Sequence, residues 1–219
     1  MSQQHEPAIN APWPVLALIG SILIANAFQQ WAGQNALILH YGFSPADLEH
    51  GRLAPVVLAL FLHAGWAHAL ANCAFALAFG SPVSRRMGED PRGASGFFVF
   101  YLACGVLANL AYAWIHPGDV NVVVGASGAV SALMGAASRL MGGGPALAPL
   151  NSRPVVGMAL AWGLVNVIFA TWLGRLAPGT GGAPIAWEVH LAGFAVGLLL
   201  FSPVLGLLGR RDFDHGMGN

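Results

Sequence analysis

The sequence predicts an all-α membrane protein: a bundle of six transmembrane helices with a helical first loop at the membrane interface. Only 8% of its 219 residues are charged and 56% are hydrophobic, whereas a soluble domain usually carries about 25% charged residues. Six apolar runs approach the length of about 20 residues that a helix needs to cross a bilayer. The arginines between these runs are distributed unevenly, as they are in membrane proteins.

Each predicted span is a nearly continuous apolar run. The six runs are residues 14–30, 66–83, 95–115, 122–140, 154–173 and 186–208. A further apolar segment, residues 53–62, is too short to cross and predicts a helix lying at the interface within the first loop. We therefore expect a short N-terminal segment (1–13), a membrane core (14–208) and a short C-terminal tail (209–219).

Arginine placement predicts the orientation of the bundle. One side of the predicted spans carries Arg85, Arg86, Arg92, Arg139, Arg153, Arg210 and Arg211. Only Arg52 and Arg175 lie on the other side. Cytoplasmic loops hold the excess of positive charge, so both termini are expected in the cytoplasm, and the compact chain favours a bacterial inner membrane. The net charge is zero, which argues against a nucleic-acid partner.

Polar side chains inside predicted spans are energetically expensive and are therefore functional candidates. Four stand out: His68, Asn72, Ser127 and His190. Ser127 lies at the outer start of the fourth span, and His190 lies at a similar depth in the sixth. Ser127 alone is compatible with a packing role. Together with an imidazole, however, it supplies the two groups that a serine hydrolase needs: the hydroxyl is the nucleophile and the imidazole is the base.

Small residues surround both candidates. Gly125 and Gly128 flank Ser127, while Gly193 and Gly197 form a G-x-x-x-G face below His190. Such faces allow close helix contact in membranes, so these glycines are expected to support the site by joining the fourth and sixth spans.

The acidic residue nearest in sequence, Glu188, is expected to point away from His190 around the helix. We therefore expect a catalytic dyad of Ser127 and His190 with no orienting carboxylate.

His68 and Asn72 lie one turn apart on one helical face. With the backbone N–H of Ser127, they are candidates to stabilise the oxyanion of an acyl-transfer reaction. His63 lies elsewhere around that helix and is expected to hold the first loop in place. No metal site is expected, because H-E-x-x-H is absent and no carboxylate or thiolate accompanies His68 and Asn72.

Together these motifs resemble the rhomboid intramembrane serine proteases. The matching residues are Gly125-Ala126-Ser127-Gly128, His190 with Gly193 and Gly197, and His63, His68 and Asn72. The resemblance covers residues 14–208 and implies a rhomboid-like bundle whose fourth helix is short and whose serine lies in a water-filled cavity. It also implies a serine endopeptidase that needs no cofactor and whose partners are the lipid bilayer and transmembrane protein substrates.

Two positions depart from the family pattern. The first loop has Gly51-Arg52 where Trp-Arg is frequent, and Ser131 stands where some members stack a Tyr on the catalytic imidazole.

Two other functions remain open: a catalytically inactive relative that binds membrane clients, and a small transporter whose polar residues line a path. The presence of both Ser127 and His190 favours the protease. The two halves show no convincing inverted repeat, which disfavours the transporter. The oligomeric state is left open.

Overall fold

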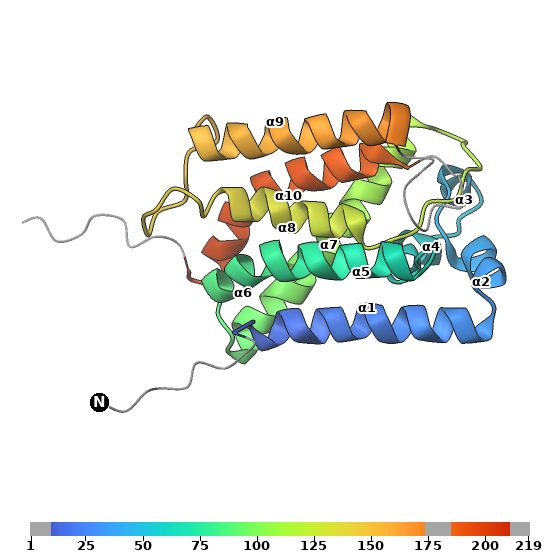
Figure 1. Cartoon of the computed structure of the whole chain (residues 1–219), viewed down its shortest axis with the longest axis horizontal. Helices are drawn as coiled ribbons and strands as arrows, with labels where there is room; N and C mark the ends of the chain where they lie inside the picture. Colours follow the sequence, from blue (N-terminus) through green and yellow to red (C-terminus); the bar gives the residue numbers. More distant parts are fainter. Residues whose placement is uncertain (1–9, 174–184, 211–219) are drawn as a thin grey trace, which may run out of the picture.

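The computed structural model describes residues 10–173 and 185–210 and shows a bundle of helices (Figure 1). The elements outside the first loop are α1 (Trp13–Ala32), α5 (Trp66–Phe75), η2 (Ala76–Gly80), α6 (Ser81–Met87), α7 (Pro91–Ile115), α8 (Ser127–Ser138), α9 (Arg153–Ile168), η3 (Phe169–Leu173) and α10 (Trp187–Leu207). The first loop contains α2 (Gln34–Tyr41), α3 (Pro45–Glu49), α4 (Ala54–Leu58) and η1 (Ala59–Phe61). The predicted all-α class is confirmed.

The helices differ in whether they can cross a membrane. Within the described residues, four are long and apolar enough: α1, α7, α9 with its π-helical end, and α10. A further pair of helical segments, residues 54–61 and 66–87, is bent by 90° at the break between them. If this pair is counted as one span, the described residues contain up to five spans. Helix α8, within the fourth predicted span, has only 12 residues, or about 18 Å at 1.5 Å per residue. These helices are compatible with the predicted six spans.

The fourth predicted span begins too early. Residues 122–126 are not helical, and α8 starts at Ser127. Their backbone instead bonds to the first loop: Phe43 and Val123 exchange N–H to carbonyl bonds of 3.0 and 2.7 Å, and the N–H of Gly125 donates to the carbonyl of Ala59 at 2.9 Å. Because each buried backbone group needs a partner, these tertiary bonds replace the helical bonds that hydropathy alone predicts.

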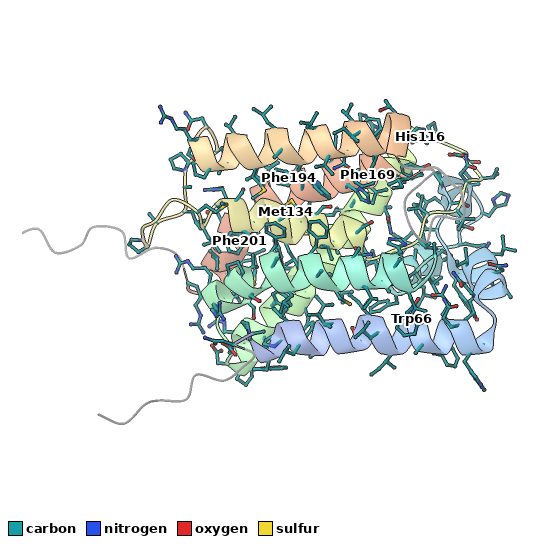
Figure 2. All side chains as sticks on the ribbon, viewed as in Figure 1. Trp66, His116, Met134, Phe169, Phe194 and Phe201 are labelled. Atoms are coloured by element: carbon teal, nitrogen blue, oxygen red, sulfur yellow. The ribbon has the colours of Figure 1, made fainter. Side chains whose placement is uncertain are left out.

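Helix α8 lies in the centre of the bundle, with α1 and α9 at opposite edges (Figure 1). Every residue from Gly128 to Ser138 is buried. Figure 2 shows Met134 of α8 in the interior, together with Phe194 and Phe201 of α10. Because the surrounding protein encloses α8, a helix too short to cross the membrane is tolerated inside the bundle.

The first loop is held by polar contacts. Ser44 and Asp47 form a reciprocal capping box at the start of α3. Arg52 pairs with Asp47 at 2.9 Å and donates to the carbonyl of His40 at 2.7 Å. The predicted short helix at 53–62 corresponds to α4 and η1, so this part of the loop is helical as expected.

Asn109 fastens this loop to the bundle. The side chain is buried on α7 and donates to the carbonyl of Val56 at 2.9 Å. We expect Asn109→Ala to lower the free energy of unfolding by about 1–3 kcal/mol, because it removes the partner of a buried carbonyl. Thermal unfolding in detergent measures the change. Asn121→Ala, an exposed control, should have little effect, and equal stability of both variants would contradict the assignment.

The predicted arginine-rich side forms one end of the structure, where α1 begins and α10 ends (Figure 1). Arg92 donates to the carbonyl of Leu207 at 2.8 Å, and Arg210 pairs with Asp90. Hydrogen bonds from the N–H of Gly93 and nearby positive charge hold the pKa of the exposed Asp90 carboxyl below its usual range. Arg175 and Arg211 lie outside the described residues.

Candidate active site

Ser127 is the first residue of α8, and the preceding turn depends on Gly125. That glycine has a φ of +123°, and a Cβ atom there would lie 2.7 Å from Cε1 of His68. A side chain is therefore excluded both by backbone conformation and by space. At a helix start, backbone N–H groups lack intrahelical partners and the helix dipole is positive. Ser127 thus lies where a developing negative charge is favoured.

His190 lies in the first turn of α10 and faces Ser127. Its Nε2 atom is 2.8 Å from Oγ of Ser127, and the pair is partly buried. Two close helix contacts set this distance: a Cβ atom on Gly193 would lie 2.0 Å from the carbonyl oxygen of Gly128, and one on Gly197 would lie 2.0 Å from that of Ala132. Glycine is required at both positions because backbone meets backbone.

The other ring nitrogen of His190 contacts α9. Nδ1 lies 2.8 Å from Oδ1 of Asn166, a side chain that is 1% exposed. The ring of Trp162, one turn earlier, lies 5.9 Å from the imidazole, centroid to centroid, at an interplanar angle of 36°. Asn166 is not among the residues predicted from the sequence, although an amide within the apolar run 154–173 carries the same signal as Asn72.

Glu188 is turned away from the pair. Its carboxylate lies 3.1 Å from Nε2 of His116, which stands at the end of the bundle where α10 begins (Figure 2). The carboxylate therefore joins the end of α7 to the start of α10. Ser131, at the position where Tyr occurs in some relatives, is buried in α8, and the ring beside His190 comes from Trp162 on α9.

His68 lies against Gly125, on the side of the turn that leads into Ser127. Its Nδ1 atom accepts from the N–H of Ala64 at 3.4 Å. A neutral imidazole with one accepting nitrogen carries its proton on the other, so Nε2 of His68 is the donor. A Cβ atom on Gly125 would lie 2.8 Å from this Nε2 and 3.7 Å from Oγ of Ser127. Both polar atoms therefore border the same small space.

Asn72 is buried one turn beyond His68. Its Nδ2 group donates to the carbonyl of His68 at 3.1 Å. An amide NH₂ has two hydrogens, so one remains for another acceptor.

His63 is hydrogen-bonded to α1 through its backbone. Its N–H donates to Oε1 of Gln29 at 2.9 Å, and its carbonyl accepts from Nε2 of the same side chain at 2.7 Å. The buried ring meets that of His68 edge-on, with ring centroids 5.1 Å apart. The contact with α1 is thus made by the main chain of His63 and by Gln29, a residue not predicted from the sequence.

The arrangement combines a hydroxyl, an imidazole and several N–H donors, the set that acyl transfer requires. In the part of the chain that the structure describes, no group of three or more His, Cys, Asp or Glu side chains could hold a metal ion.

Comparison with known proteins gives the family of the chain. The family model of the Rhomboid domain matches residues 50–206, well over half of the chain. The chain belongs to the rhomboid family. Rhomboid-like protein 11, chloroplastic, of Arabidopsis thaliana is 37% identical over 121 residues, which are 55% of this chain and 38% of that relative. The match therefore spans less than half of the relative's length.

The rhomboid match begins just before α4 and includes α8 and α9, whereas α1, α2 and α3 precede it. Family membership and the long apolar helices identify an integral membrane protein. Members of the rhomboid family are intramembrane proteases or inactive homologues, and this chain is one or the other.

Proposed function

We propose that this rhomboid is an intramembrane serine endopeptidase that cleaves transmembrane segments of membrane-anchored proteins. Ser127 is the nucleophile and His190 the base. The observation that carries the proposal is the 2.8 Å separation between Oγ of Ser127 and Nε2 of His190 at the start of a buried helix. A hydroxyl needs an adjacent base to attack an amide near neutral pH.

The reaction proceeds through an acyl-enzyme. Oγ of Ser127 bonds to the substrate carbonyl carbon while its proton passes to Nε2 of His190. The tetrahedral intermediate then expels the amine, which takes that proton. A water molecule next attacks the ester and gives a proton to His190. The second tetrahedral intermediate then releases the acid, and His190 returns this proton to Oγ of Ser127. No cofactor enters this sequence.

Three donors are suited to the oxyanion: the backbone N–H of Ser127, Nε2 of His68 and the second amide hydrogen of Asn72. His68 has the firmer case because its ring borders Gly125 beside Ser127. Removing one such donor typically costs about 10²–10³-fold in kcat.

We expect His68→Ala and Asn72→Ala each to lower kcat, with a smaller loss than Ser127→Ala, because the backbone donor and one side-chain donor remain. The decrease for His68→Ala should be about 10²-fold. Steady-state cleavage of a reporter substrate measures both. If either well-folded variant were as inactive as Ser127→Ala, the proposed division of roles would be wrong.

We further propose that residues 14–208 form the catalytic core between short cytoplasmic ends, 1–13 and 209–219, in a bacterial inner membrane. The gathering of arginines at the end where α1 begins and α10 ends supports this orientation. Labelling of single cysteines by a membrane-impermeant reagent, in the first loop and in the loop before α9, tests it. Preferential labelling of the latter in intact cells would contradict it.

The deciding experiment is cleavage of a single-span model substrate by purified protein in liposomes, with Ser127→Ala as the matched control. Cleavage that this change abolishes supports the protease. Well-folded wild-type protein that neither cleaves several substrates nor reacts with a covalent serine probe would instead support a client-binding homologue.

A further inference from the structure

Asn166 stands out on a helix with little buried surface. Along Arg153–Ile168, the buried residues are Val155 and Asn166. An amide inside a membrane bundle is costly unless its polar atoms are bonded. Both of its groups are in use here: Oδ1 faces Nδ1 of His190 at 2.8 Å, and Nδ2 donates to the carbonyl of Trp162 at 2.8 Å.

The bond to Trp162 decides which way the amide faces. A carbonyl oxygen only accepts, so the NH₂ group of Asn166 must point toward it. In the flipped amide, two oxygens would face each other and lose this bond. Oδ1 is therefore the atom directed at His190, and it too is only an acceptor.

The amide orientation in turn decides the tautomer of His190. Because Oδ1 accepts, Nδ1 of His190 carries the proton, and in a neutral imidazole the other nitrogen is then a lone-pair acceptor. That nitrogen, Nε2, lies 2.8 Å from Oγ of Ser127. The opposite tautomer would present an N–H to the serine and could not take its proton.

We propose that Asn166 is a positioning residue that holds His190 in the Nδ1–H tautomer, so that Nε2 can act as the base toward Ser127. The proposal rests on the proposed function and extends the expected dyad to Ser127, His190 and Asn166. Trp162, on the same helical face, places its ring beside the imidazole. Asn fills the corresponding role beside histidine in papain-like proteases, and a neutral amide avoids the cost of burying a carboxylate.

Kinetics of three variants test the role. Asn166→Leu keeps the approximate size of the side chain and removes the acceptor, whereas Asn166→Asp keeps an acceptor. We expect Asn166→Leu to lower kcat by about 10²-fold with little change in KM, and Asn166→Asp to recover at least about tenfold of that loss. Thr171→Val, which removes a 2.8 Å bond to the carbonyl of Val167 on the same helix, should retain wild-type activity.

A spectroscopic measurement tests the tautomer without activity. Protein with ¹⁵N-labelled histidines is studied in liposomes by solid-state NMR above neutral pH, where imidazole is uncharged. The His190 signals are those lost in His190→Gln. We expect a protonated Nδ1 and an unprotonated Nε2 in the wild type, and a shift toward protonated Nε2 in Asn166→Leu.

The two measurements separate this inference from the proposed function. If wild-type protein cleaves but Asn166→Leu has the same kcat and tautomer, the role of Asn166 is overturned and the protease stands. If Asn166→Asp is no better than Asn166→Leu, the residue is merely structural. If well-folded wild-type protein neither cleaves several substrates nor reacts with a covalent serine probe, the protease proposal fails, and the NMR result still decides whether Asn166 sets the tautomer.

Discussion

Replacing His190 by alanine is expected to lower the rate of substrate cleavage by about 10⁴-fold or more, close to the loss in Ser127→Ala. Without the imidazole, the serine hydroxyl has no group to take its proton, and the departing amine has no group to protonate it. Any residual rate would come from substrate binding and the oxyanion donors. Cleavage of a single-span reporter in liposomes measures the rates.

Combining the two substitutions gives a stronger test, because the losses in rate from residues that act as a unit are not additive. Ser127→Ala combined with His190→Ala should be no slower than either single change. His50→Ala is the matched control, since that ring lies in the exposed part of the first loop and should leave the rate unchanged. Losses that multiplied in the double variant would show that the two side chains act independently.

Replacing Gly197 by valine is expected to prevent normal folding. A Cβ atom there would lie 2.0 Å from the oxygen and 2.5 Å from the carbon of the Ala132 carbonyl. No flexible side chain can move aside, so α10 would have to separate from α8. We expect a loss of at least about 4 kcal/mol in unfolding free energy, seen as a lower midpoint of thermal unfolding in detergent and a poor yield of monodisperse protein.

The matched control for this variant is Gly163→Val on α9, where an added Cβ meets nothing within 4 Å. It changes the same residue type within a membrane helix and should cost no more than about 1 kcal/mol. Unaltered stability and activity in Gly197→Val would mean that α8 and α10 do not approach closely at this position. Since the same contact sets the Ser127 to His190 distance, partly folded Gly197→Val should also be inactive.

Much of the fold follows from local properties of the sequence. Hydropathy over about 20 residues locates membrane helices because each must satisfy its own backbone bonds in lipid. The structure has a helix within every predicted span, and the short segment before the second span is helical too. Ser127 and His190 could be named from sequence because polar groups in apolar runs are costly, and the structure brings them together. Their catalytic roles remain proposals.

Other features depend on contacts between distant segments, which no spacing rule supplies. Helix α8 begins at Ser127 because residues 122–126 bond to the first loop, although hydropathy predicts a helix from residue 122. Asn166, which lies 24 positions before His190 in the chain and on a different helix, contacts its imidazole. The sequence by itself determined the membrane class, the approximate spans and the nucleophile and base candidates, because these depend on residue type and helical period. Only the tertiary structure decided where the short helix starts and which side chain faces the second nitrogen of the imidazole, because both depend on which helices pack together.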